Sequence, residues 1–198
     1  MKAGDRAEAT EMAAGLNSDN MDFHELILKR QSTRKYLPDN VDTALVTKCI
    51  EAARLAPSAC NSQPWHFIVV DDKELIMEMG KAAAGLGMNG FAAGVPVMIA
   101  VILEKMNFTA KVGSMLKNKD YCMLDLGIAV EHFCLQAAED GLGTCILGWF
   151  DEKQVARLLG VPKGKRIPLL ITLGYPDCEI RKKTRKTLEE ISSWNKYR

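Results

Sequence analysis

The sequence of 198 residues lacks the cysteine spacing of a metal site or a redox motif. Its six cysteines include no pair separated by the roughly two to four residues that zinc ligands favour, and no Cys-x-x-Cys. Cys49, Cys122 and Cys134 instead fall within helical patterns, where a thiol packs as a small apolar side chain. Such cysteines are typical of a reducing compartment, so we predict a cytoplasmic protein without a bound metal.

The chain also lacks an excess of charge and a long apolar run. Its 26 basic residues nearly balance 25 acidic ones, which leaves a formal net charge of +1. A nearly neutral chain has no global attraction to nucleic acid or to an anionic membrane. No apolar stretch approaches the ~20 residues that cross a bilayer, and nothing resembles a secretory signal. We therefore expect no membrane and no nucleic-acid partner, unless charges cluster locally.

A catalytic nucleophile or general base is missing as well. His24, His66 and His132 lie far apart in the sequence and have no carboxylate at helical spacing. Neither a Gly-x-Ser-x-Gly elbow nor a His-Glu-x-x-His helix is present. We expect these histidines to be structural and no side chain to be catalytic. An enzyme with this sequence would take its reactivity from a cofactor.

One dinucleotide-like pattern occurs in an unsuitable context. Gly85, Gly87 and Gly90 match Gly-x-Gly-x-x-Gly, but they follow a helical pattern and no helix begins behind them. The motif binds a pyrophosphate only between a strand and a helix N-terminus. We predict a flexible bend at this position.

Hydrophobic periodicity predicts a single α+β domain over residues 21–198, preceded by a flexible extension at 1–20. Residues 95–103 form a nearly continuous apolar run, typical of a central strand buried on both faces. Residues 120–140 carry apolar side chains on more than one stripe, so we expect a helix whose second side lies in a subunit interface. The polar stretch 104–119 is interpreted as a mobile flap. The other expected elements are helices over 22–31, 42–55, 72–84 and 151–159, strands over 65–71 and 168–173, a helix stop with a tight turn over 141–144, a short apolar segment over 145–149 and a turn over 174–176.

Two basic segments could bind an anion. Arg30, Ser32 and Arg34 place guanidinium and hydroxyl groups at the end of the first helix, a combination that suits a phosphate monoester. A solvated helix cap is the alternative. The run 181–186 has five basic residues in six. It is consistent with a charged surface tail, with a nucleic-acid patch, or with a segment that folds back to the same phosphate.

The stretch 56–67 concentrates unusual residues before a β-branched run. Pro57 and Pro64 restrict the backbone, small residues permit close approach, and Asn61 and Gln63 can each donate and accept hydrogen bonds. These features fit a ligand-binding loop as well as a tight structural turn.

Four ordered motifs within residues 21–198 together resemble FMN-dependent nitroreductases. They are Arg-x-Ser-x-Arg at 30–34, Ala-Pro-Ser-x-x-Asn-x-Gln-Pro-Trp-x-Phe at 56–67, Asp-Leu-Gly-Ile-Ala at 125–129 followed by Gly-Leu-Gly-Thr-Cys-Ile-Leu-Gly at 141–148, and Leu-Gly-Tyr-Pro at 173–176 with a Lys-x-Arg tail. The resemblance implies an α+β fold with a central, mostly antiparallel sheet wrapped by helices. It also implies an obligate homodimer that holds two FMN molecules at its interface.

By motif position, the resemblance assigns the basic residues to FMN. Arg30 and Ser32 are expected to contact the phosphate or the ribityl chain, and Lys183 and Arg185 the phosphate. Arg34 is expected nearer the flavin pyrimidine, where positive charge stabilises the anionic reduced form.

The resemblance assigns the proline-rich loop to the flavin of the partner subunit. Pro57, Ser58 and Ala59 would pack on the ring, and Asn61 and Gln63 would support the loop.

Further assignments concern the opposite side of the flavin. The backbone of Leu147 and Gly148 is expected to lie along the ring and to donate toward N5, and Asn89 aligns with an asparagine near the flavin in larger members. Gln31 departs mildly from the pattern. The segment between Leu103 and Asp120 is shorter than in larger members, which bears on substrate specificity.

These expectations predict hydride transfer from NAD(P)H, a transient reductant, through FMN to a small electron-poor acceptor such as a nitroaromatic or a quinone. The mechanism would be ping-pong, with both substrates using one cleft. A dehalogenase or a flavin-fragmenting enzyme of the same fold is the first alternative. A nucleic-acid-binding module with a basic tail is the second.

Overall fold

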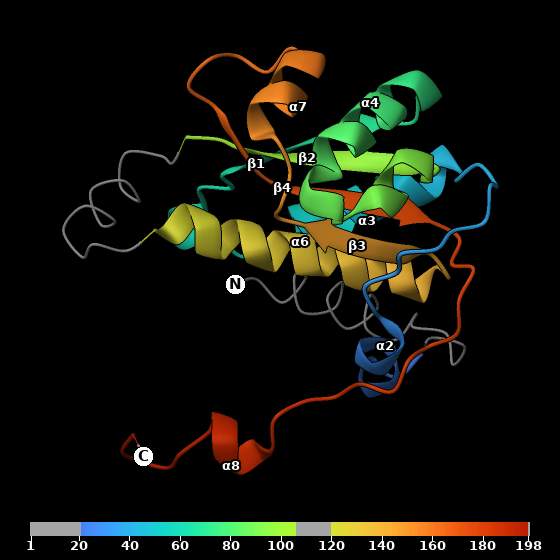
Figure 1. The fold of residues 1–198 in the computed structure, drawn as a ribbon. Coiled ribbons are helices and arrows are strands. Elements are labelled where there is room, and N and C mark those ends of the chain that lie inside the picture. Colours follow the sequence, from blue (N-terminus) through green and yellow to red (C-terminus); the bar gives the residue numbers. More distant parts are fainter. Residues whose placement is uncertain (1–20, 106–119, 198) are drawn as a thin grey trace, which may run out of the picture.

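The computed structural model describes residues 21–105 and 120–197 (Figure 1). The predicted extension at 1–20 and most of the expected flap at 104–119 lie outside these residues. Among the helices described, none is long and apolar enough to cross a membrane.

The centre of the fold is a four-stranded sheet in the order β1-β2-β4-β3. Each neighbouring pair is antiparallel, as the predicted α+β class requires. The strands are β1 (Trp65–Val70), β2 (Val97–Leu103), β3 (Gly143–Leu147) and β4 (Arg166–Gly174). β2 and β4 occupy the middle, and β1 and β3 lie at the two edges.

Helices cover both faces of this sheet, so the domain has three layers (Figure 1). One face carries α3 (Thr43–Arg54) and α6 (Tyr121–Glu139), and the other carries α4 (Lys73–Ala83) and α7 (Glu152–Leu158). The central strand β2 is buried on both sides, as its apolar run predicted. Its side chains alternate between the two cores: Val97, Ile99 and Val101 pack with α3 and α6, and Met98, Ala100 and Ile102 pack with α4 and α7.

Aspartates begin four of these helices where the sequence predicts them. The carboxylates of Asp42, Asp72, Asp120 and Asp151 accept hydrogen bonds from backbone amides of the first turn, at 2.8 to 3.2 Å. Each such cap stabilises a helix by about 1 kcal/mol. The short helix α2 (Phe23–Lys29) begins after Asp22, also as expected, but without a side-chain cap.

Three predicted boundaries were wrong. β3 begins at Gly143, inside the expected turn over 141–144. β4 extends back to Arg166 and contains Pro168, which lies where the β2–β4 register is irregular and a missing amide is tolerated. A turn was expected over 174–176, but Gly174 is the last residue of β4, and Pro176 forms an isolated bridge with Tyr36.

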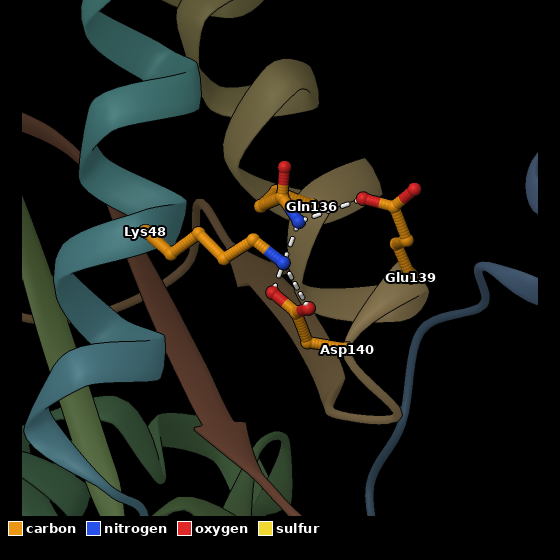
Figure 2. A network of polar contacts seen from close by, with 4 residues as sticks. All are labelled: Lys48, Gln136, Glu139 and Asp140. Atoms are coloured by element: carbon orange, nitrogen blue, oxygen red, sulfur yellow. Dashed lines mark hydrogen bonds and ion pairs between the residues drawn. The ribbon is translucent and has the colours of Figure 1, made fainter. Parts of the chain in front are cut away.

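A polar clamp joins α3 to the C-terminal end of α6 (Figure 2). Lys48 Nζ lies 2.6 Å from Asp140 Oδ1, and the amide nitrogen of Gln136 donates to Glu139 and to Asp140. The hydrogen bond to Asp140 raises the pKa of Lys48 above its ordinary value. The lysine thus offsets a carboxylate at a helix C-terminus, where negative charge is unfavourable.

After residue 180 the chain passes α2 and then extends away from the body of the domain to α8 (Leu188–Ile191) (Figure 1). This short helix in the tail is closed by a capping box between Thr187 and Glu190. Its apolar residues are exposed, with Leu188 at 73% and Trp194 beyond it at 89%.

Candidate functional site

The two basic segments meet in one groove. Arg30, Ser32 and Arg34 line it together with Lys183 and Arg185, and the groove has a volume of about 340 Å³. Six of its nine lining residues are cationic and none is acidic. Of the alternatives for the tail run, the structure therefore favours a segment that folds back onto the first basic motif.

Gln31 fastens the tail to the first motif. Its side-chain oxygen accepts hydrogen bonds from the backbone amide and the Nε of Arg181, at 3.1 and 3.3 Å. Its side-chain nitrogen donates to the Glu179 carbonyl at 3.0 Å. Arg181 Nη2 also donates to the carbonyl of Ser32 at 2.8 Å. Sequence reasoning missed these roles, because the partners are separated by about 150 positions and neither carries a local signal.

Positive charge in the groove is only partly balanced. Arg30 Nε lies 3.3 Å from Glu131 Oε1, but no hydrogen bond is aligned at this buried nitrogen. Lys183 Nζ donates to the backbone carbonyl of Arg30. Burial lowers the pKa of Lys183, and the charges of Arg30 and Arg185 lower it further. An anion in the groove would relieve this repulsion, so the donor set fits a phosphate.

The edge strand β3 leads away from the groove. Ser32 bridges Thr144, and the Thr33 amide donates to the Thr144 carbonyl at 2.8 Å. A Cβ on Gly143 would lie only 2.6 Å from Thr33 Oγ1, so glycine is needed for this close approach. Gly148 follows Thr144 by four positions, a distance of about 13 Å in an extended chain. The edge thus connects the groove with the predicted flavin-facing segment at Leu147–Gly148.

The proline-rich loop has a strained backbone. Cys60, Asn61 and Gln63 all have positive φ, at 51°, 50° and 46°. Such strain costs about 1–3 kcal/mol per residue and often marks a functional site. The loop is held by Ser58 Oγ, which accepts from the Gln63 amide at 2.9 Å, and by Asn61 Oδ1, which accepts from Gln63 Nε2 at 2.8 Å.

The loop does not line the groove of its own chain. The Ala59 amide donates to the buried Asp125 carboxylate at 3.0 Å, near the start of α6. Arg30 meets Glu131, six residues farther along the same helix. That separation corresponds to about 9 Å and to a different side of the helix. Pro57, with the rest of the loop, therefore lies apart from the basic residues within one chain.

Other expectations from the sequence can be placed as well. His24 and His66 are exposed, and His132 Nδ1 lies 3.3 Å from the Ala52 carbonyl. Gly85 begins a 3₁₀ turn directly after α4 and Gly90 begins a second one, with no strand before them, so the motif lacks the strand that a dinucleotide site needs, as predicted. Asn89 Nδ2 donates to the carbonyl of Trp149, close to Leu147 and Gly148. Over residues 21–105 and 120–197, no cluster of metal-ligating side chains occurs.

Comparisons with known proteins agree with this geometry. The model of the Nitroreductase family matches residues 27–175. The chain is 30% identical over 172 residues to the oxygen-insensitive NADPH nitroreductase of Helicobacter pylori (strain J99), covering 73% of this chain and 82% of the relative. It is 25% identical over 167 residues to the iodotyrosine deiodinase of Thermotoga neapolitana, covering 78% and 89%. A solved FMN-dependent nitroreductase of Clostridium difficile R20291 has a TM-score of 0.72 at 29% identity, covering 87% of this chain and 98% of that one.

Proposed function

The chain belongs to the nitroreductase family, as its motifs indicated, and on this premise we propose that it is an FMN-dependent oxidoreductase. It transfers hydride from NAD(P)H to an electron-poor acceptor, such as a nitroaromatic or a quinone, by a ping-pong mechanism. The observation that carries the proposal is the basic groove, where two segments about 150 positions apart converge. The names of the relatives, an NADPH nitroreductase and an FMN-dependent nitroreductase, support the same chemistry.

The groove residues hold the phosphate end of the cofactor. Arg30, Ser32, Lys183 and Arg185 supply charge-assisted and hydroxyl hydrogen bonds there, which are stronger than bonds between neutral groups. Arg34 places positive charge toward the pyrimidine end. These residues bind and orient, and the chain uses no side-chain acid or base.

FMN, when bound, supplies the hydride chemistry that no side chain of this protein offers. The edge strand β3 runs from its pairing with Ser32 and Thr33 at the groove to Leu147 and Gly148, and the backbone of these two residues would support the ring. Gly148 suits close approach, since a Cβ there would have no neighbour nearer than 3.9 Å, from Leu169.

A second copy of the chain completes the proposed site. The strained loop with Ser58 and Ala59 does not line the groove of its own chain, so we infer that the loop of a partner subunit would cover it. The outer face of α6 supports such a dimer, since Met123, Leu124 and Ile128 are 41, 60 and 41% exposed there. An exposed apolar helix face of this kind is typical of a subunit interface.

The test is the purified protein's spectrum and kinetics. We expect flavin absorbance, sedimentation as a dimer, and oxidation of NADH or NADPH that depends on an added nitroaromatic or quinone. A colourless protein that takes up no added FMN would refute the proposal. Comparing both nicotinamides across an acceptor panel would also identify the preferred reductant.

Dehalogenation is a second candidate function, because the chain also resembles an iodotyrosine deiodinase. Release of iodide from 3-iodotyrosine by the reduced protein, faster than reduction of any nitroaromatic in the panel, would favour it. The absence of iodide release would leave the nitroreductase activity as the function.

A further inference from the structure

A glycine-rich turn is tied to the end of the edge strand β3. The turn consists of η2 (Gly85–Gly87) and η3 (Gly90–Gly94), with Asn89 between them. Asn89 Nδ2 donates a hydrogen bond of 3.0 Å to the backbone carbonyl of Trp149, 60 positions away. Trp149 is the neighbour of Gly148, so the hydrogen bond joins the turn directly to the segment that supports the proposed cofactor ring.

Asparagine suits this position for a conformational reason. Asn89 has a φ of 55° and a ψ of 20°, in the left-handed region that asparagine tolerates better than most residues. Its side chain is therefore presented to Trp149 from an unusual backbone geometry. Such geometry persists only where surrounding contacts stabilise it, and the bond to Trp149 is one of these contacts.

The indole of Trp149 lies against the glycine-rich turn, and the residue is still partly exposed to solvent. A Cβ on Gly85 would lie 3.6 Å from Trp149 Nε1, so the ring lies in contact distance of the turn. The Asp151 amide donates to the Ala82 carbonyl at 2.9 Å and fixes the backbone that follows. Nevertheless 53% of Trp149 is exposed. A large aromatic side chain, one residue from Gly148 in the chain, thus packs against the turn and still keeps about half of its surface exposed.

We propose that Trp149 is the surface on which the ring of the acceptor stacks, and that Asn89 is a positioning residue for it. This inference rests on the proposed function, which places the cofactor ring at Gly148. The electron-rich indole stacks well on an electron-poor ring, so the geometry selects planar aromatic acceptors over small aliphatic ones.

The first test measures binding without turnover. The probe is 4-nitrobenzoate, titrated calorimetrically into the oxidised FMN-loaded dimer in the absence of NAD(P)H. We expect Trp149→Ala to raise the Kd of the probe about fivefold to tenfold, the size of a lost aromatic pair, and Trp149→Phe to keep most of the affinity. Met77→Ala removes a similarly exposed apolar side chain from α4 and serves as the control that leaves the Kd unchanged. An unchanged Kd in Trp149→Ala would overturn the stacking role.

Kinetics separate stacking from a general loss of structure. In Trp149→Ala, the KM for 4-nitrobenzoate should rise by the same factor as the Kd, while kcat stays within about twofold. Reduction of ferricyanide, which offers no ring, should be unaffected. Equal losses with both acceptors would contradict selection of an aromatic ring.

The positioning role is tested with Asn89→Asp, which keeps the size and the tolerance of positive φ but cannot donate a hydrogen bond at neutral pH. We expect about threefold weaker probe binding and greater acrylamide quenching of the Trp149 emission, isolated by difference from Trp149→Phe. Wild-type binding and quenching in Asn89→Asp would refute it.

The two proposals fail in different ways. A protein that cannot be loaded with FMN refutes the proposed function. A protein that holds FMN, but whose Trp149→Ala variant binds the probe as the wild type does, refutes only the stacking surface.

Discussion

Two lysine side chains of this protein, Lys48 and Lys183, lie in opposite surroundings. In the clamp between α3 and α6, Lys48 faces the carboxylate of Asp140, whose side chain is only 11% exposed (Figure 2). In the basic groove, Lys183 faces a backbone carbonyl and lies among other cations. The pKa shifts follow this difference, since the pKa of Lys48 is raised by its partner and that of Lys183 is lowered by burial and like charge.

The comparison distinguishes Lys48, whose charge stabilises the fold, from Lys183, whose charge is available to bind a ligand. A cation next to a carboxylate contributes to the stability of the free protein. The cations of the groove, which are held together by Gln31 and backbone carbonyls, contribute little to stability until an anion binds. The groove is therefore the better candidate for a binding site, although the clamp has the shorter ion pair.

The largest expected effect is on cofactor affinity in the groove. Replacing Arg30 and Arg185 together by alanine should weaken FMN binding by about 100-fold or more, because two charge-assisted phosphate bonds of about 1.5–3 kcal/mol each are lost. The free energy of unfolding of the apoprotein, followed by its melting temperature, should fall by much less than the free energy of FMN binding. Binding is measured by quenching of FMN fluorescence.

Arg54→Ala provides the matched control for this double variant. Arg54 is exposed and paired with Glu51 on α3, away from the groove. The variant should bind FMN as tightly as the wild type. Equal FMN affinity in the double variant and in the control would remove the phosphate assignment.

The second prediction compares two lysine variants, one expected to lower stability and the other expected to weaken FMN binding. Lys48→Met should lower the free energy of unfolding by about 1 kcal/mol, because Asp140 loses its partner, and should leave FMN affinity unchanged. Lys183→Met should weaken FMN binding about tenfold and change the apoprotein's stability by less than about 0.5 kcal/mol. Urea unfolding of the apoprotein and FMN titration measure the two quantities. If both variants lost stability and affinity to the same extent, the distinction between clamp and groove would be wrong.

The smallest effect is a pH dependence at the clamp. The folded-state pKa of Lys48 lies above its ordinary value of 10.5, so its contribution is complete below pH 10.5 and is lost as the pH rises through the folded-state value. The stability difference between wild type and Lys48→Met, about 1 kcal/mol at pH 8, should therefore shrink above pH 10.5. Urea unfolding of both proteins at pH 8 and at pH 11 measures it. A difference that stays constant would contradict the role of the ion pair.

Local patterns predicted most of the elements correctly. Asp42 and Asp151 cap their helices as expected, because a cap involves only neighbouring amides. The run 95–103 gave the central strand, because burial on both faces leaves no polar position. The boundaries at Gly143 and Pro168 were predicted wrongly because they depend on contacts with segments far away in the sequence. The contact is with Thr33 in one case and with the irregular part of β2 in the other.

The candidate site divides in the same way. Motif resemblance led to the two arginines of residues 30–34, to the proline-rich loop and to the basic tail. It gave no sign of Gln31 as the fastener of the tail, or of the bond from Asn89 to Trp149. Hydrogen bonds from a side chain to residues far away in the sequence leave no periodic pattern in either segment.

The sequence alone determined the helix starts, the burial of the central strand on both faces and the residue types available for binding an anion. Only the tertiary structure decided that residues 30–34 and 181–185 share one groove, and that the loop at 57–63 of the same chain does not line it. The physical reason is the distance along the chain over which each effect acts. Backbone propensities and caps act over a few residues, whereas the meeting of segments about 150 positions apart depends on the summed packing of every layer between them.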